Sequence, residues 1–259
     1  MTNGWEQLAE KKEEVKETKE TMFKNLSEVG EKRGLKIGIY GDFATGKTHF
    51  ALTCPEPIYI IDTENGSAPL AHSFKGKDIK VLDVCEEDGS KSYDKIVEAI
   101  NYIINQENVG TVVIDSVSDL WDFAQENAKV KVFKISVLER LKQQWDWGTI
   151  NKMYLSLLLK LINKNCNLIL TARESEVYAG AGQPTNIVKP KWQKATGYWM
   201  DLVLYADKKI TKEGTTFIST IEKSRQFKDL MGKQFYNLTY QNLLDEINKL
   251  KGGQNGNQK

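Results

Sequence analysis

The sequence KIGIYGDFATGKTHFAL, residues 36–52, decides the class of fold. An apolar run ends at Gly41, and Gly46, Lys47 and Thr48 follow after four residues, which satisfies the pattern G-x-x-x-x-G-K-[ST]. This pattern has meaning only between a strand and a helix. The apolar residues 35–40 predict the strand, and residues 47–53 are compatible with the helix. We therefore expect a strand–loop–helix unit of an α/β fold.

The residue types in this loop are those that a phosphate group requires. Glycine lets the backbone turn sharply, and successive backbone N–H groups then point at the anion. Lys47 is expected to neutralise the β- and γ-phosphate oxygens, and the Thr48 hydroxyl to bind Mg²⁺. We expect a nucleoside triphosphate and Mg²⁺ as ligands, and ATP is the nucleotide that the resemblance described below implies. The predicted nucleotide contacts are Gly41, Asp42, Phe43, Ala44, Thr45, Gly46, Lys47, Thr48 and His49.

Short apolar runs alternate with helical patterns along the rest of the chain. Predicted strands cover residues 35–40, 57–62, 79–84, 111–115, 167–171, 201–207 and 216–222, and predicted helices cover 47–53, 92–106, 148–163 and 239–250. Alternation of this kind predicts a mostly parallel sheet with helices on both faces. The last two strands are joined by a short, hairpin-like connection, so we expect the sheet to end antiparallel.

Three regions of different composition suggest the domain organisation. Residues 1–33 are rich in Lys and Glu with a sparse apolar stripe, which predicts an N-terminal helical arm. This arm is either a solvated helix packed by one narrow face or a segment that docks on a neighbouring subunit. Residues 34–250 form the expected core, and the polar residues 251–259 are expected to be a disordered tail.

Composition sets broad limits on the function. The chain has 259 residues and a net charge of +1, which by itself predicts no partner. Three scattered cysteines favour a reducing compartment over a disulfide framework. The N-terminus has no apolar core of a signal peptide, and no segment is long and apolar enough to span a bilayer. We expect no membrane partner and a cytoplasmic protein.

Two further predicted strands end in acidic residues. The run PIYIIDTENG places Asp62, Thr63 and Glu64 at the end of the second strand, where Glu64 is suited to activate the attacking water. Asp62 would serve the metal shell, or these residues cap the following turn; the spacing leaves both readings open. Within the run TVVIDSVSDLW the predicted strand ends in Asp115. From that position a carboxylate supports Mg²⁺ beside a phosphate loop.

Two cations follow the last predicted strand in the run IEKSRQF. Lys223 and Arg225 lie two residues apart, so in an extended segment they project from the same side. They either pair with surface acids or reach the nucleotide of an adjacent subunit, as arginine fingers do. In the second case they act catalytically together with Glu64 and Lys47.

The order of these motifs resembles that of the RecA-like ATPases, which include recombinases, DnaB-type helicases and KaiC. The segment IDTE is similar to the recombinase segment that carries the catalytic glutamate, here Glu64. IDSVSDLW is similar to the Walker B segment, and KSR is similar to the K-x-R that completes a neighbour's site. The resemblance covers residues 35–248. It implies a three-layer RecA-like sandwich, an ATPase and a homo-oligomeric ring or filament.

The segment LILTARESEVY also resembles the T-x-R turn of phage-encoded RecA-like AAA-domain proteins, here Thr171 and Arg173. Some members of that group act in single-strand annealing and recombination. One departure stands out, because recombinases place a Gln sensor after this strand and this chain has Thr171.

Residues 173–198 predict a long loop that contains glycine, proline, cations and aromatics. Cations interleaved with rings are typical of single-strand binding. A solvated loop whose rings pack on the body is the alternative. A second lysine-rich segment, residues 129–152, has Trp145 and Trp147, which we interpret as packing residues. The predicted DNA-binding residues are Arg173, Tyr178, Lys189, Lys191, Trp192 and Lys194.

These features favour an ATPase that acts on single-stranded DNA in recombination or annealing, with a DNA-stimulated site shared between subunits. The alternative is a RecA-like motor or nucleotide switch, such as a helicase, loader or packaging accessory in viral or plasmid replication. A small-molecule kinase is disfavoured, because no Arg-rich lid is present and Glu64 and the K-x-R would have no role. A scaffold with little turnover is disfavoured by the intact Glu64.

Overall fold

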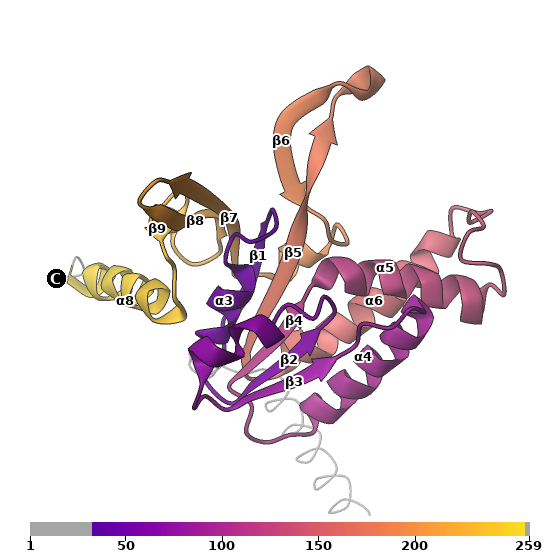
Figure 1. Cartoon of the computed structure of the whole chain (residues 1–259), viewed down its shortest axis with the longest axis horizontal. Helices are drawn as coiled ribbons and strands as arrows, with labels where there is room; N and C mark the ends of the chain where they lie inside the picture. The colour runs from indigo at the N-terminus through magenta and orange to yellow at the C-terminus, as the bar shows by residue number, and fades with distance from the viewer. Residues whose placement is uncertain (1–32, 257–259) are drawn as a thin grey trace, which may run out of the picture. The chain divides into compact units, whose positions relative to one another are not determined.

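The computed structural model describes residues 33–256, and Figure 1 shows how their elements are arranged. Strand β1 (Lys36–Gly41) leads through the loop into helix α3 (Lys47–Leu52), as residues 36–52 predict. Every residue of β1 is buried, and the same holds for β2 (Ile58–Asp62) and β4 (Thr111–Asp115). Continuous apolar runs of this kind are typical of strands that are covered on both faces.

The strands of the described region pair in the order β3-β2-β4-β5-β1-β7-β8-β9, with β6 paired to β5. The pairs from β3 across to β7 are parallel, whereas β7–β8, β8–β9 and β5–β6 are antiparallel. The predicted mostly parallel sheet with an antiparallel C-terminal edge is therefore confirmed. The remaining bounds are β3 (Ile79–Asp83), β5 (Asn167–Tyr178), β6 (Pro184–Pro190), β7 (Leu202–Thr211), β8 (Gly214–Ser224) and β9 (Gln234–Tyr236).

Helices cover both faces of the sheet, which gives the expected three layers (Figure 1). Helices α4 (Gly89–Ile104), α5 (Val117–Asn127) and α6 (Asp146–Asn163) contribute to the apolar core of one face. Helix α3 and helix α8 (Tyr240–Gly256) contribute to the core of the other face. Helix α6 buries a single stripe with helical spacing, made by Ile150, Tyr154, Leu157, Leu158 and Leu161.

Short helical segments connect the larger elements. The 3₁₀ segments are η1 (Ala68–Phe74), η3 (Gly180–Gly182) and η4 (Lys228–Leu230). Segment η2 (Ala128–Val132) is a turn of π-helix that continues α5, and α7 (Thr196–Trp199) is a single short helix before β7.

Several elements differ from the sequence-based expectations. Helix α5 was not predicted, although Ser116 caps it by accepting a hydrogen bond from the Asp119 amide. Strands β6 and β9 were also missed. Helix α8 continues past residue 250 to Gly256, so residues 251–256 of the predicted disordered tail are helical. The predicted N-terminal arm lies outside the described residues, apart from residue 33.

None of the helices between residues 33 and 256 combines the length and the apolar character that a bilayer crossing requires.

Candidate nucleotide site

The loop that follows β1 needs glycine at both ends. At Gly41 an added Cβ would lie 2.0 Å from the carbonyl oxygen of Ala206, so no larger residue fits without moving β7. Gly46 has φ of 85°, a left-handed conformation that side chains rarely adopt. The backbone at Gly46 also lies against the Phe217 ring. Strand β7, through Ala206, and strand β8, through Phe217, therefore restrict the conformation of the loop.

The Lys47 ammonium lies within the curve of this loop. It donates to the carbonyl oxygens of Gly41 at 3.0 Å and Asp42 at 2.6 Å. Burial lowers the pKa of Lys47, while the negative charges of Asp115 and Glu64 act in the opposite direction. The side chain is thus already aimed at the space that the loop encloses, where phosphate oxygens would replace the carbonyls as its acceptors.

Asp115 ends strand β4 as a buried carboxylate held by two hydroxyl groups. Thr48 Oγ1 donates to Asp115 Oδ2 at 2.6 Å, and Thr171 Oγ1 donates to Asp115 Oδ1. Burial raises the pKa of Asp115, and the hydrogen bonds from Thr171 and Thr48 oppose that rise. Thr171, which stands where recombinases have their Gln, thus orients the carboxylate.

The Thr48 hydroxyl oxygen and the Asp115 carboxylate suit Mg²⁺, which prefers hard oxygen ligands. Within residues 33–256 no group of three or more His, Cys, Asp or Glu side chains gathers as a metal site. Mg²⁺ is commonly held by one or two protein oxygens together with water and substrate phosphates. Thr48 and Asp115 fit that pattern, as the sequence predicts.

Asp62 stabilises a turn. Its carboxylate accepts hydrogen bonds from the backbone N–H groups of Glu64, Gly66 and Ser67, and from the Ser67 hydroxyl. With its acceptor sites used in this way, Asp62 is the turn cap, and its suggested place in the metal shell is wrong.

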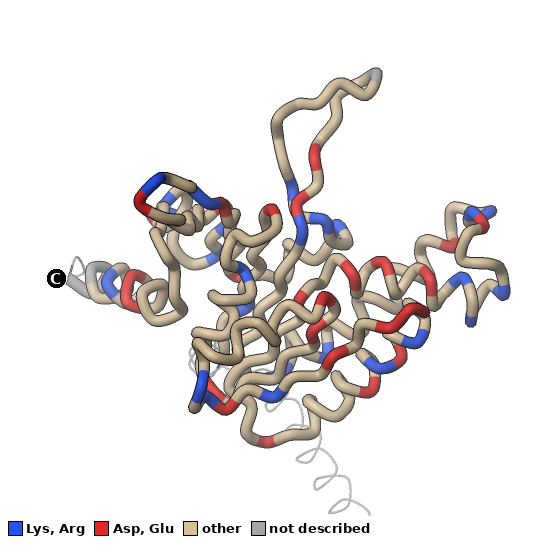
Figure 2. The backbone as a smooth tube through the Cα atoms, in the orientation of Figure 1, with Lys and Arg blue, Asp and Glu red and all other residues tan. Residues whose placement is uncertain are grey.

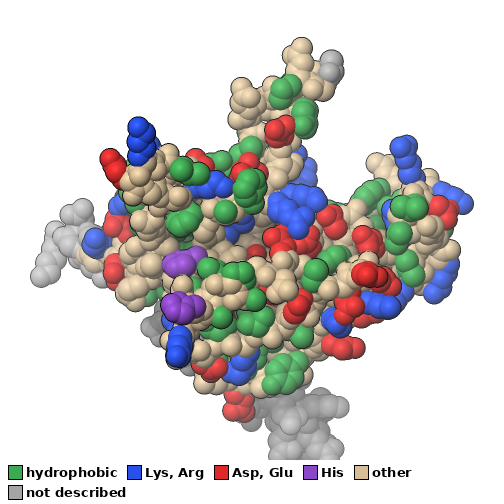
Figure 3. Space-filling view, in the orientation of Figure 1, with side chains coloured by type: hydrophobic (Ala, Val, Ile, Leu, Met, Phe, Trp, Pro, Cys, Tyr) green, Lys and Arg blue, Asp and Glu red, His purple; other side chains and the backbone are tan. Residues whose placement is uncertain are grey.

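Glu64 forms an ion pair with Arg173. Arg173 Nε donates to Glu64 Oε1 at 2.8 Å, and Arg173 NH2 lies 2.8 Å from the same oxygen and 2.9 Å from Asp119 Oδ1. Burial disfavours the charged guanidinium, but Asp119 and Glu64 outweigh it and raise the pKa of Arg173. Figure 3 shows basic and acidic side chains meeting below the base of the β5–β6 hairpin.

The other predicted nucleotide contacts line the loop or border it. Thr45 is buried and its hydroxyl donates to the Asp42 carbonyl, and Ala44 has a positive φ of 54°. Phe43 is 78% exposed, and Lys208 Nζ lies 4.2 Å from its ring centroid. The His49 ring lies 5.1 Å from the ring of Phe74, centroid to centroid.

A cavity of about 270 Å³ adjoins the loop on the side of His49. Sequence reasoning missed most of its lining, because Phe217, Ser219, Asn237 and Leu238 come from β8 and the chain after β9. The Asn237 side chain accepts a hydrogen bond from the Phe217 amide, which ties these two segments together. The lining residues are Thr45, Gly46, His49, Phe50, Phe217, Ser219, Asn237 and Leu238.

The predicted DNA-binding loop is a β-hairpin for most of its length. Strand β5 continues to Tyr178 and β6 returns from Pro184, so the hairpin projects beyond the sheet (Figure 1). Two of the predicted contacts are engaged elsewhere, and those predictions are corrected. Arg173 pairs with Glu64 and Asp119. Trp192 packs over Gly38, where an added Cβ would lie 2.6 Å from the Trp192 ring.

The remaining predicted contacts lie on the hairpin and its base. Lys191 Nζ is paired with Asp122 Oδ2 at 2.7 Å. Tyr178 is 59% exposed and donates to Glu176, and Lys189 and Lys194 are exposed. Figure 2 shows that the charges of the hairpin lie toward its base and that its tip carries almost none.

The two tryptophans of the second lysine-rich segment, residues 129–152, differ in contacts and exposure. Trp147 lies 6.4 Å from Trp121, ring centroid to ring centroid, but remains 42% exposed, so it packs by one side only. Trp145 is 72% exposed, and its interpretation as a packing residue is wrong.

Lys223 and Arg225 lie at the opposite edge of the sheet from the phosphate loop. Ser224 pairs with Leu202 at the start of β7, whereas the loop follows the carboxyl end of β1. Lys223 Nζ donates to the carbonyls of Gly197 and Met200, and burial lowers its pKa. Arg225 donates to the Tyr198 carbonyl, and its NH1 lies 3.7 Å from Asp201 Oδ1. Neither cation reaches its own nucleotide site.

Sequence reasoning gave Thr63 no separate role and missed Asp119. The Thr63 hydroxyl lies 2.8 Å from Asp119 Oδ2 and accepts from the Ser116 amide at 2.7 Å. One signal for Asp119 was present, since Ser and Asp three residues apart are a helix-start pattern. That signal identifies a cap, and only the fold shows that Asp119 also faces Arg173.

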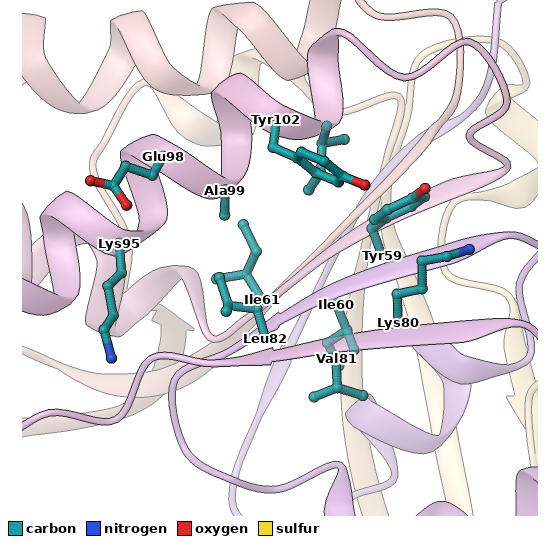
Figure 4. Close-up of a pocket in the computed structure, with 11 residues that line it drawn as sticks. Tyr59, Ile60, Ile61, Lys80, Val81, Leu82, Lys95, Glu98, Ala99 and Tyr102 are labelled. Carbon is teal, nitrogen blue, oxygen red and sulfur yellow. The ribbon is translucent and has the colours of Figure 1, made fainter.

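A separate apolar hollow of about 510 Å³ lies between β2, the edge strand β3 and α4. Figure 4 shows its side chains, with Tyr59, Val81 and Tyr102 among them. Its lining includes no residue of the phosphate loop and none of the Asp115 and Glu64 groups. The hollow is therefore not part of the nucleotide site.

Comparison with known proteins agrees with the fold. The family model AAA_24, described as an AAA domain, matches residues 33–249. The crystal structure of the RadB recombinase is 17% identical, with a TM-score of 0.50, and the match covers 79% of this chain and 86% of that one. At this identity it supports the fold alone.

A KaiC-like protein from Pyrococcus horikoshii OT3 is also similar. It is 17% identical with a TM-score of 0.47, and the match covers 79% of this chain and 85% of that one. No curated protein sequence matches the chain.

Proposed function

Because this chain belongs to the AAA_24 family of AAA domains and is a P-loop ATPase with a RecA-like fold, we propose that it couples ATP hydrolysis to the binding of single-stranded DNA in recombination or annealing. The observation that carries the proposal is the path of β5. This strand passes from Thr171 and Arg173 in the nucleotide site directly into the projecting hairpin. One continuous strand thus joins the proposed site of hydrolysis to an exposed surface.

The phosphate loop and its neighbours supply the parts that hydrolysis requires. Lys47 holds phosphate oxygens, and Thr48 and Asp115 would hold Mg²⁺. When bound, Mg²⁺ neutralises the charge that develops on the phosphate oxygens. Glu64 is the carboxylate placed to orient the attacking water, because Asp62 is committed to its turn and Asp115 to the metal.

The cavity beside His49 is suited to the base of the nucleotide. It adjoins Gly46, so a nucleotide whose phosphates lie in the loop would extend its base toward Phe217 and His49. Aromatic walls favour a planar ring by stacking. The cavity of about 270 Å³ has mainly apolar walls and a few polar groups, the kind of lining that small-molecule sites have.

The hairpin supplies the proposed contact with DNA. Tyr178 offers an exposed ring for stacking, and Lys189 and Lys194 offer exposed charge for the phosphate backbone. The charge is modest, since Lys191 is paired with Asp122. We therefore expect binding that depends on stacking as much as on phosphate contacts.

We assign the contact with a neighbouring subunit to Arg225. Lys223 is bound to two backbone carbonyls, which suits a residue that positions the turn around Tyr198. Arg225 is 44% exposed in its side chain and lies at the sheet edge remote from its own phosphate loop. An arginine in that place contributes to hydrolysis only in trans, in a ring or filament of this chain.

ATP turnover across a salt series, with and without single-stranded DNA, tests the proposal. We expect stimulation that fades as salt rises, because salt competes with contacts to the phosphate backbone. The double variant Lys189→Gln/Lys194→Gln should weaken DNA binding and flatten the plot of log affinity against log salt by roughly 1.4, at about 0.7 for each lost contact with a single strand.

The matched control changes two lysines on a different hairpin. Lys209→Gln/Lys212→Gln removes the same charge from exposed positions at the β7–β8 turn and should leave the salt dependence unchanged. Turnover that single-stranded DNA does not change at any salt concentration would count against the proposal and favour a nucleotide switch with another effector.

A further inference from the structure

The cavity beside the phosphate loop contains one polar side chain that is held by the backbone of another strand. Asn237 follows β9 and lines the cavity together with Phe217. It has φ of 50°, a left-handed conformation that asparagine adopts more readily than most residues. Its N–H donates to the Phe217 carbonyl at 2.8 Å, and its Oδ1 accepts from the Phe217 N–H at 3.2 Å. Asn237 is thus bonded to both backbone groups of one residue of β8.

These bonds determine which way the Asn237 amide faces. The Phe217 N–H requires an acceptor, so the amide oxygen lies toward β8 and the amide nitrogen lies on the other side. Among residues 33–256, Nδ2 donates to no other group, and Oδ1 keeps one of its two lone pairs. The cavity therefore presents an acceptor and a donor side by side. Their order cannot be reversed without breaking the bond to Phe217.

The Phe217 ring supplies a flat surface between this amide and the phosphate loop. An added Cβ at Gly46 would lie 3.3 Å from the ring, so the ring packs against the end of the loop. A nucleotide whose phosphates lie in the loop would extend its base along that ring. Stacking on an aromatic ring tolerates every base, because every base has a π-face. Selection among bases therefore requires a polar group that reads the edge of the base.

A fixed amide distinguishes adenine from the 6-oxopurines. Adenine has an amino donor at C6 next to ring-nitrogen acceptors, and asparagine pairs with such an edge through two hydrogen bonds. Hypoxanthine and guanine have a carbonyl acceptor at C6 instead. In the same position that carbonyl would face Asn237 Oδ1, and two acceptors repel each other. An amide that rotates freely would turn over to suit either base, but the Phe217 N–H prevents this.

We propose that Asn237 selects adenine. Its Oδ1 accepts from the amino group at C6, its Nδ2 donates to the adjacent ring nitrogen, and Phe217 holds the amide in that order. The proposal rests on the proposed nucleotide site and names the residue that makes this site specific for one base. The phosphate loop itself contacts the part that all nucleoside triphosphates share, so the specificity comes from the chain after β9.

ADP and inosine diphosphate test the proposal, because they differ only in the group at C6 and the proton at N1. In titration calorimetry with Mg²⁺ and without DNA, the wild-type chain should bind ADP at least about tenfold more tightly than inosine diphosphate. In Asn237→Asp the carboxylate still accepts from the Phe217 N–H but has no donor for the base. The ADP affinity should fall roughly tenfold, and the preference over inosine diphosphate should shrink to about twofold or less.

Two further variants separate the reading of the base edge from other effects. Asn186→Asp makes the same change at an exposed position on β6 that also has a positive φ, of 57°, and should alter neither affinity. Phe217→Leu removes the stacking surface but keeps the backbone groups that hold Asn237. Both affinities should then fall by a similar factor, and the preference for ADP should remain.

The outcomes distinguish this proposal from the nucleotide site on which it rests. Equal binding of the two diphosphates by the wild-type chain would overturn the proposal while the nucleotide site stands. Equal losses for both in Asn237→Asp would do the same, because they would indicate a structural role that does not depend on the base. Failure of the wild-type chain to bind either diphosphate would overturn the nucleotide site itself. Because DNA is absent from the experiment, the outcome does not depend on the proposed DNA partner.

Discussion

Thr171→Val isolates one hydrogen bond at the centre of the site. Thr171 is completely buried, and its hydroxyl donates to the carboxylate of Asp115, which is 4% exposed. Valine has nearly the shape of threonine, so the change removes the donor without opening a cavity. Asp115 keeps its hydrogen bond from Thr48 and loses the other.

The expected loss of stability follows from that geometry. A hydrogen bond to a charged group contributes about 1.5–3 kcal/mol, and the buried carboxylate finds no water in exchange. We expect Thr171→Val to lower the free energy of unfolding by about 2 kcal/mol. With a urea m-value near 3 kcal/mol/M, the unfolding midpoint falls by roughly 0.7 M.

A second effect concerns Mg²⁺. Groups that orient a metal ligand typically change metal affinity by about 10–100-fold when they are removed. The Mg²⁺ concentration that half-saturates ATP turnover should therefore rise at least about tenfold in Thr171→Val.

Urea unfolding followed by circular dichroism measures the first effect, and turnover across a Mg²⁺ series measures the second. Thr215→Val, at an exposed position on β8, makes the same chemical change and should shift stability by less than about 0.5 kcal/mol. If Thr171→Val is as stable as this control and keeps its Mg²⁺ dependence, then Thr171 does not hold Asp115.

Three other changes follow from the same structure. Lys36 is fully buried and donates to backbone carbonyls just beyond α6, so Lys36→Met should lower the free energy of unfolding by about 2–4 kcal/mol in urea; an unchanged midpoint would contradict this. Gly38→Ala puts a methyl group against the Trp192 ring and should cost about 1–3 kcal/mol in the same assay, unless the ring moves freely. The Arg225→Ala variant should bind nucleotide but not hydrolyse it. In an equal mixture with the Glu64→Gln variant, about a quarter of head-to-tail interfaces combine an intact Glu64 with an intact Arg225, and activity should return at those interfaces. No recovery at any mixing ratio would exclude a shared site.

The local parts of the fold and site were predictable because their signals are local. A strand, five loop residues and a helix start lie within residues 36–52, and their chemistry determines their role. Buried strands such as β2 and β4 are continuous apolar runs, and their ends identify the acidic residues. The same reasoning located Lys47, Thr48 and Asp115 in one cluster.

The hairpin shows where that reasoning stops. Residues 173–190 contain glycine and proline, and they alternate weakly, so the sequence is equally compatible with an irregular loop. The pairing of β6 with β5 is stabilised by backbone hydrogen bonds, which carry no side-chain signal. Trp192 was likewise ambiguous, because the bare Gly38 that receives its ring lies more than a hundred residues earlier in the chain.

Arg173 was assigned to DNA because its type and its loop suit that role, and the correction comes from strand order. The order β2-β4-β5 brings three strand ends to one edge of the sheet, although Glu64 and Arg173 are 109 residues apart. Parallel strands in that order must place the residues that follow β2 and β4 beside the end of β5. A cation at that end meets the carboxylates of Glu64 and Asp119 before it meets any external partner. Once the strand order is known, the pairing of Arg173 with Glu64 and Asp119 follows from charge.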